Sequence, residues 1–215
     1  YAQLVSAIKG YAENDFPATA GSFSSTDQLN TFIEQAEQRI FNSIQFPVIR
    51  KNVTGTTTSG NKYLATPVDF LSVFSIAVIA ANGSYEFLLN KDVNFIREAY
   101  PTPTDLGTPA YYALFNENTF ILGPTPDSNY STELHYFYYP ESIVTAGTSW
   151  LGDNFDSVLL YASLLEAAAF MKSDPDTIKN YTDRYNEALL LAKRLGDGLD
   201  RQDAYRSGQV RIPVK

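Results

Sequence analysis

The stretch from Asp153 to Lys172, DNFDSVLLYASLLEAAAFMK, constrains the fold most, because its apolar residues surround a helical wheel almost completely. A helix that is apolar on every face must be buried on every face, so this stretch predicts a helix at the centre of a bundle. We expect Asp153 or Asn154 to cap its first turn. Lys172 would close its last turn, where the helix dipole favours a cation.

A membrane span is the alternative interpretation of the same stretch. A span needs about 18 unbroken apolar residues. Four polar residues interrupt this run: Asp156, Ser157, Ser163 and Glu166. We therefore predict a helix buried in protein, and no membrane partner.

Three further helices are predicted from apolar residues at helical spacing. They cover residues 1–13, residues 26–46 up to Pro47, and a stretch that restarts at Ser173-Asp174-Pro175 and ends at Gly196. The last of these would form an antiparallel hairpin with the central helix.

Residues 48–145 change to a pattern that is typical of strands. Strands are expected over 48–54 and 63–64, joined by the flexible loop 55–60. Ser72–Ala80 and Tyr85–Leu89 would form a hairpin through a type I′ turn at Asn82-Gly83. A short helix over 92–100 precedes three more strands, over 110–115, 119–122 and 130–139.

The predicted fold class is therefore α+β: an antiparallel helical bundle of about four helices with an inserted β-rich antiparallel module and an extended C-terminal tail. The expected domains are a helical bundle (1–47 with 148–198), the β-rich insertion (48–147) and a C-terminal docking tail (199–215).

Composition excludes several function classes. The chain has no cysteine and one histidine, which removes disulfides, thiolate metal sites, a cysteine nucleophile and any zinc site built on paired histidines. The formal net charge of −8 argues against sequence-specific recognition of nucleic acid, since such proteins present a basic face to phosphates. No cofactor is predicted.

The few candidate catalytic or metal-binding residues have simpler explanations. A glycoside hydrolase needs two carboxylates at a set separation. The pairs that could supply them, Asp153 with Asp156 and Glu98 with Asp105, are better explained by a helix cap and a loop. His135 is interpreted as a surface or interstrand residue, and Asp127-Ser128-Asn129 as a turn and not a calcium loop. We therefore predict that the protein is not an enzyme.

Tyrosines on the last strand could make an interface. Side chains alternate between the two faces of a strand, so Tyr136 and Tyr138 would share one face and Phe137 and Tyr139 the other. The alternative function follows from this: a carbohydrate-binding or receptor-binding β module of a tail or surface protein. Its stacking platforms would be Tyr136, Tyr138, Tyr111 and Tyr112.

Two small polar loops are expected to be surface tips without a packing role, and so to be available for contacts. They contain Thr56, Thr57 and Thr58 in the first loop, and Asn116, Glu117 and Asn118 in the second. The tail 199–215 carries four basic and two acidic residues on an acidic chain, which favours a segment that orders on a partner. Its contact residues would be Tyr205, Arg206, Val210, Arg211 and Ile212.

The order of these features resembles a known family. The run YLATPVDFLSVFSIAV, a short helix ending in EAY, then GTPAYYALFNENTFILGPTPD, ELHYFYYPES, WLGDNFDSVLLYASLLEAAAF and DAYRSGQVR are similar to the phage head-to-tail adaptor proteins. These include the tail tubular protein A type of short-tailed phages.

The resemblance implies a structural virion protein at the head–tail junction, assembled in the host cytoplasm and without catalysis. Such adaptors form a ring, usually of twelve copies, between the portal protein and the tail nozzle or tube. Double-stranded DNA would pass through the ring without sequence-specific binding. The tail would dock on the portal, while the polar loops would face neighbouring subunits or the nozzle.

Overall fold

The computed structural model describes residues 1–18, 23–44 and 46–206; at position 47 and from 195 to 206 it describes the backbone alone. The chain forms two compact units. The first, called here the helical unit, contains Tyr1–Val48 and Pro140–Lys215, and the second, the β unit, is the contiguous segment Ile49–Tyr139. The α+β fold class is confirmed.

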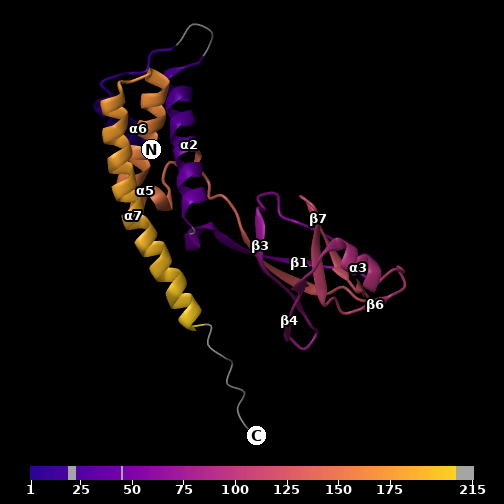
Figure 1. Ribbon diagram of the computed structural model, residues 1–215. Coiled ribbons are helices and arrows are strands. Elements are labelled where there is room, and N and C mark those ends of the chain that lie inside the picture. The colour runs from indigo at the N-terminus through magenta and orange to yellow at the C-terminus, as the bar shows by residue number, and fades with distance from the viewer. Residues whose placement is uncertain (19–22, 45, 207–215) are drawn as a thin grey trace. The chain divides into compact units, whose positions relative to one another are not determined.

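The helical unit contains six helices among the described residues. These are α1 (Ala2–Ala12), α2 (Ser25–Ser43), α4 (Ile143–Ala146), α5 (Trp150–Asn154), α6 (Asp156–Met171) and α7 (Pro175–Arg206). Figure 1 shows α2, α6 and α7 side by side, and α6 also contacts α1 and α5. The predicted central helix is therefore the helix around which the unit packs.

Helix α6 is buried along most of its length. Its core residues are Val158, Leu159, Ala162, Ser163, Leu164, Ala167 and Ala168. The predicted cap is wrong, because Asp153 and Asn154 belong to the short helix α5, and Phe155 occupies the N-cap of α6 without a side-chain bond. Burial of every face is also incomplete, since Phe170 near the C-terminal end is 45% exposed.

Helix α7 starts where the sequence predicts. The Asp174 carboxylate accepts hydrogen bonds from the backbone N–H groups of Asp176 and Thr177, both at 3.0 Å, which caps the first turn. The expected end at Gly196 is wrong, because the helix continues through both glycines to Arg206. One glycine costs a helix only about 1 kcal/mol relative to alanine, which does not suffice to end it.

The β unit is a three-layer arrangement. Its two larger sheets have the strand orders β1-β10-β3-β4 and β2-β8-β7-β5. Their bounds are β1 Arg50–Thr56, β2 Tyr63–Ala65, β3 Ser72–Ile79, β4 Tyr85–Phe87, β5 Leu89–Asn90, β7 Tyr111–Asn116, β8 Thr119–Gly123 and β10 Ser131–Phe137. A 3₁₀ turn (Pro47–Ile49) leads into β1, and β6 (Leu106–Gly107) pairs with β9 (Thr125–Pro126).

The core of the β unit lies between the two four-stranded sheets. It is built from Ile76, Val78, Leu88, Tyr112, Phe120, Leu122, Leu134 and Tyr136. Helix α3 (Val93–Ala99) covers the other face of the second sheet, where Ile96 packs against Ala113 and Ile121. The outer face of the first sheet has no such cover within the described part of this unit.

The predicted hairpin of β3 with β4 is confirmed but its predicted turn type is wrong, and the loop after β1 joins two strands that do not pair with each other. Strands β1 and β2 do not form a hairpin: β1 pairs with β10, and β2 pairs with β8 in the other sheet. The turn between β3 and β4 is not type I′, which requires a positive φ at both central residues, because only Gly83 has one (82°). Residues 81–83 instead form a three-residue loop, closed by the bonds from Gly83 N–H to the Ala80 carbonyl and from Ala80 N–H to the Ser84 carbonyl.

Candidate interaction surfaces

The outer face of the sheet β1-β10-β3-β4 carries exposed aromatic side chains. Antiparallel partners that lie directly opposite each other share a face, so the register places Phe137 beside Arg50, and Phe87 beside Ala77. Phe74 is the extra residue of a bulge against β10. Phe74 and Phe87 are 54% and 66% exposed, and exposed aromatic residues grouped on one face are typical of a surface that binds a partner.

Aromatic and cation–π contacts organise this face. The Phe74 and Phe137 rings meet edge to face at 5.9 Å between centroids, and the Arg50 guanidinium lies 4.8 Å from the Phe74 centroid. Tyr85 and Phe87 stack at 6.5 Å on the edge strand β4. The face is therefore held in one shape by its own contacts, as a preorganised binding surface requires.

A polar network crosses the middle of the same face. The Asn52 side-chain amide donates to the Glu133 carboxylate at 2.6 Å, and the Glu133 carboxylate lies 3.0 Å from the His135 ring. Hydrogen bonds from Asn52, and then from Tyr85, lower the pKa of Glu133, so this group is ionised at neutral pH. His135 is thus an interstrand residue of this network.

The tyrosines predicted as an interface lie on the opposite, inner face. Tyr136 is 1% exposed, and its hydroxyl donates to the Asp69 carboxylate at 2.8 Å. Tyr138 is half-buried against the same core. The prediction of an aromatic interface at these two positions is therefore wrong for Tyr136. Since Tyr112 is also buried, two of the four stacking platforms of the carbohydrate-binding alternative are unavailable.

The Asp69 carboxylate joins the inner face to the edge strand. It accepts a hydrogen bond from the Lys51 ammonium at 2.8 Å as well as the one from Tyr136. The Lys51 bond is the larger cause that lowers the pKa of Asp69, and the same bond raises the pKa of Lys51. Both groups are partly exposed, so the pair stabilises the unit modestly.

The loop after β1 is not the free tip that its composition predicts. Thr57 is 3% exposed, and its hydroxyl accepts the backbone N–H of Tyr130 at 2.9 Å. Ser59 N–H donates to the Asn129 side chain at 2.8 Å, and Gly60 N–H to the Pro126 carbonyl at 2.8 Å. The expectation that this loop has no packing role is wrong, although Thr56 and Thr58 are exposed.

The second predicted loop is an exposed turn. Asn116, Glu117 and Asn118 connect β7 to β8, and Asn118 N–H donates to the Asn116 side chain at 2.9 Å. Thr66 N–H donates to the Asn118 carbonyl at 3.0 Å, which ties the turn to the chain after β2.

The predicted tail residues fall at or beyond the end of the described chain. Tyr205 and Arg206 are the last two residues of α7, and only their backbone is described. Val210, Arg211 and Ile212 lie outside the described residues.

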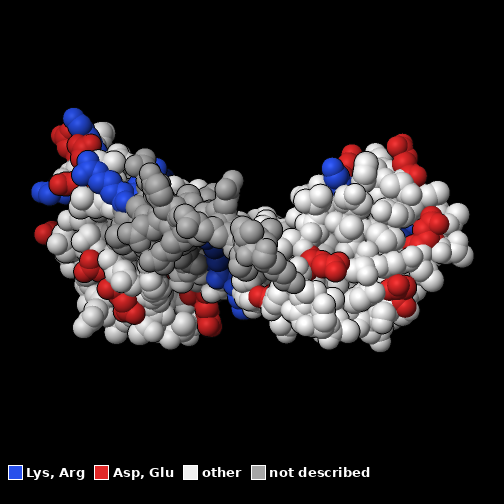
Figure 2. Space-filling view, turned by 90° about the horizontal axis from the view of Figure 1, so that it is seen from below, with Lys and Arg blue, Asp and Glu red and all other residues white. Residues whose placement is uncertain are grey.

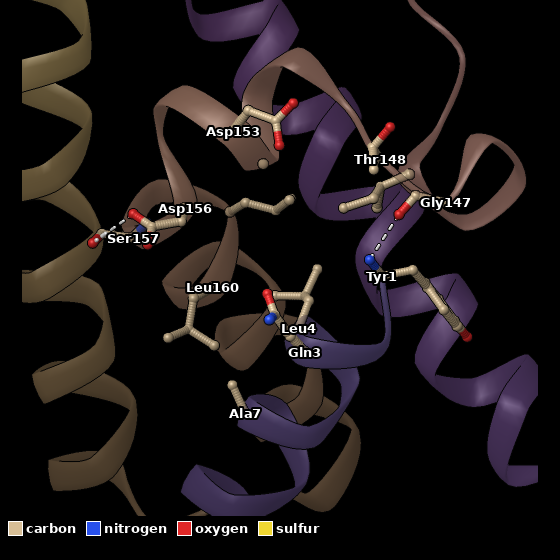
Figure 3. Close-up of a pocket in the computed structure, with 13 residues that line it drawn as sticks. Tyr1, Gln3, Leu4, Ala7, Gly147, Thr148, Asp153, Asp156, Ser157 and Leu160 are labelled. Carbon is tan, nitrogen blue, oxygen red and sulfur yellow. Dashed lines mark hydrogen bonds between the residues drawn. The ribbon is translucent and has the colours of Figure 1, made fainter.

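A pocket of about 310 Å³ lies in the helical unit, between α1, the 147–148 loop, α5 and α6 (Figure 3). The backbone nitrogen of Tyr1 donates to the Gly147 carbonyl at 2.8 Å beside it. Leu4, Ala7 and Leu160 supply apolar walls, and Asp153 and Asp156 supply its two carboxylates.

These two carboxylates are the acid pair considered in the sequence. Both are exposed and therefore hydrated, whereas the general acid of a glycosidase is held protonated by an apolar environment. The second pair fits a loop, since the Asp105 carboxylate accepts the Thr102 N–H at 3.3 Å. Among the residues described, no three His, Cys, Asp or Glu side chains are grouped to hold a metal ion.

Charge is dispersed over the face drawn in Figure 2. Acidic side chains of the β unit, on the right, form separate groups with uncharged surface between them. In the ranges that the structure covers, no helix is long and apolar enough to cross a membrane.

Sequence reasoning missed the exposed aromatic face. The alternation Tyr85-Glu86-Phe87 carried part of the signal, because two aromatics flanking an acid on a short strand share one face. The assignment of that face to the outside required the pairing of β1 with β10, which no local pattern gives.

Comparison with known proteins identifies a family. The sequence model of a family described as SU10 adaptor protein matches residues 1–213. No curated protein matches the chain. The match spans both units, and its description is that of an adaptor and not of an enzyme.

Proposed function

The chain belongs to the SU10 adaptor protein family, and on that premise we propose that it is a structural protein of a phage virion that joins the head to the tail. The family match over residues 1–213 carries this proposal. The resemblance of the sequence to head-to-tail adaptors, including the tail tubular protein A type, supports the finer role. The subunit forms a ring, of twelve copies by that resemblance, between the portal protein and the tail nozzle or tube.

The ring serves as a conduit for DNA during ejection. Each copy adds a formal net charge of −8, and acidic side chains that face a lumen repel phosphate, so DNA passes without being held. Binding of duplex DNA to the assembled ring at low salt tests this. We expect weak binding, and tight retention would contradict an acidic lumen.

The C-terminal tail is the proposed portal contact. Arginines 206 and 211 would make forked bonds to carboxylates, while Tyr205, Val210 and Ile212 fill apolar pockets. Truncation after Arg206 leaves every described helix intact. Such a subunit should fold with unchanged thermal stability but fail to join portal-bearing heads, and normal tailed particles would refute the assignment of Val210, Arg211 and Ile212.

The polar loops are the proposed contacts to the nozzle or to neighbouring subunits. Because Thr57 is buried, the informative changes are at exposed positions, and we choose Thr58→Arg and Glu117→Arg. These variants should fold normally and lower the yield of tailed particles. A normal yield from both would exclude these loops.

The central test is location. Infection without the protein should give filled heads that lack tails, and the wild-type protein supplied in trans should restore tailed particles. Electron microscopy of virions with a labelled subunit should place the label at the head–tail junction. A label elsewhere, or tailed particles without the protein, would refute the proposed function.

A further inference from the structure

The long edge strand β1 presents outward backbone groups, at Asn52, Thr54 and Thr56, that pair with no other backbone group among the described residues. Tyr138 N–H donates to the Ile49 carbonyl, and Thr57 N–H to the Tyr130 carbonyl, both at 2.9 Å. Since the direction of backbone groups alternates along a strand, every second residue between Ile49 and Thr57 faces β10. The N–H and C=O groups of Asn52, Thr54 and Thr56 face away, and within the described chain they make no backbone hydrogen bond.

The opposite edge of the same sheet is also open. Strand β4 is bonded to β3 through Leu88 N–H to the Ile76 carbonyl, which leaves the backbone groups of Tyr85 and Phe87 facing outward. The side chains of these two residues are 53% and 66% exposed. Proteins usually protect strand edges with charges, prolines or a covering element, because open edges recruit other strands.

The two edges are complementary in direction. All three strand pairs of the sheet are antiparallel, so β1 and β4 at its two ends run in opposite directions. A second copy placed beside the first by a small rotation would therefore offer its β1 antiparallel to the first copy's β4. Repetition of this contact is head-to-tail, and such contacts close into a ring when the rotation between copies closes.

We propose that β1 of one copy pairs with β4 of the next, so that the sheets of adjacent subunits become continuous. The inference rests on the proposed function in one respect, that the copies form a ring. Outward-facing residues pair with outward-facing residues, so Tyr85 lies opposite Asn52, Thr54 or Thr56.

Side-chain chemistry selects among these registers. With Tyr85 opposite Asn52, Phe87 lies opposite Arg50 on the outer face, and Glu86 lies opposite Lys51 on the inner face. The other two registers place Val53 or Gly55 opposite Glu86. Only the first joins an acid to a base and a cation to an aromatic ring, and the Lys51 ammonium has donors left besides its bond to Asp69.

Engineered cysteines test the contact directly, because the chain has no cysteine of its own. Residues opposite each other in an outward-facing pair have Cα atoms about 5.5 Å apart, within the range that a disulfide spans. The double variant Asn52→Cys/Tyr85→Cys, oxidised in solution and in purified virions, should give a ladder of covalent multimers. The single variants Asn52→Cys and Tyr85→Cys should give none.

A proline variant gives a second test of the β1–β4 contact. Asn52→Pro removes the side chain that donates to Glu133 and one outward backbone N–H, and an edge strand tolerates the loss of such an N–H, so the subunit should fold but not assemble. Asn52→Ala, which removes the same side chain, should assemble. Far-ultraviolet circular dichroism of both variants reports whether they fold.

The outcomes separate the contact from the proposed function. Subunits that reach the virion without forming the 52–85 disulfide, or Asn52→Pro subunits that assemble like Asn52→Ala, overturn the β1–β4 contact alone. Dimers from Asn52→Cys alone overturn it as well, because they show two β1 strands meeting. A chain that is absent from virions and forms no multimer overturns both proposals.

Discussion

The buried carboxylate of Glu37 on α2 should matter more to stability than its neighbours on the helix surface. Glu37 is 4% exposed, and its Oε1 accepts the backbone N–H of Ile143 at 3.0 Å. Ile143 is the first residue of α4, where the chain re-enters the helical unit after the β unit. The bond therefore ties the segment that returns from the β unit to the core of the helical unit.

The magnitude follows from the burial of both partners. Glu37→Ala leaves the Ile143 N–H without its acceptor in a residue that is 5% exposed. An unsatisfied buried donor costs about 1–3 kcal/mol, and a hydrogen bond to a charged group contributes about 1.5–3 kcal/mol. Relief from burying the carboxylate offsets part of the loss, so we expect the free energy of unfolding to fall by about 1–3 kcal/mol.

Glu37→Gln separates the hydrogen bond from the charge, because the amide oxygen can accept the same N–H. Burial raises the pKa of Glu37 above its ordinary value of 4.5. A group with a raised folded pKa binds its proton more tightly in the folded state, so its effect on stability becomes less favourable as pH rises through that pKa. Relative to wild type, Glu37→Gln should therefore gain stability from acid to neutral pH.

Urea unfolding followed by fluorescence of the single tryptophan measures these changes. Trp150 lies in the helical unit, with its ring 5.0 Å from that of Phe46, so its signal reports the unit that contains Glu37. Glu34→Ala, at an exposed position one turn earlier, should change the free energy by less than about 0.5 kcal/mol. A Glu37→Ala variant as stable as that control would refute the reasoning.

Three further predictions concern the β unit, and urea unfolding followed by circular dichroism measures each. Tyr136→Phe removes the buried hydroxyl that donates to Asp69 and should lower the free energy of unfolding by about 1 kcal/mol. The Lys51 hydrogen bond lowers the pKa of Asp69, so its stabilising effect is present above the unfolded pKa and is lost as pH falls through the folded one; Asp69→Asn should remove this acid sensitivity. Thr57→Val keeps the shape of the side chain but leaves the partly buried Tyr130 N–H without its acceptor, and should lower the free energy of unfolding by about 1 kcal/mol, whereas Thr58→Val at an exposed position should lower it little.

Unchanged stability in Tyr136→Phe would show that water replaces the lost bond. An equal acid sensitivity in Asp69→Asn and wild type would place the responsible carboxylate elsewhere. Equal losses in Thr57→Val and Thr58→Val would contradict the role of the buried hydroxyl.

The helices could be predicted because their signals are local. The central helix needs only the composition of its own residues, and the start of α7 needs only Asp174 and Pro175. The helix caps are less predictable than the helices. Asp153 and Asn154 are good capping residues, but both lie inside the short helix α5, which Ser149 caps.

Strand partners could not be predicted, because the relevant contacts lie far apart in the sequence. Asn52 pairs with His135, yet neighbouring strands favour a hairpin as the default interpretation. The burial of Thr57 and Tyr136 depends on the packing of β10 beside β1, which the residues around each position do not indicate. The face that exposes Phe74 and Phe87 is likewise set by the pairing of β10 with β1 and β3, which joins segments far apart in the sequence.

Because the β unit is inserted within the helical unit, it can fold during synthesis before the helical unit that begins the chain. Helix α2 leaves the ribosome early, but its partner α6 follows only after the contiguous segment Ile49–Tyr139. At about 5–20 residues per second, roughly 110 intervening residues delay that partner by on the order of 5–20 s. The β unit is therefore fully synthesised before α6. Until α6 is made, the core residues Phe32, Ile33 and Ile40 of α2 remain exposed to solvent. During synthesis the N-terminal helices are thus the segment most in need of a chaperone.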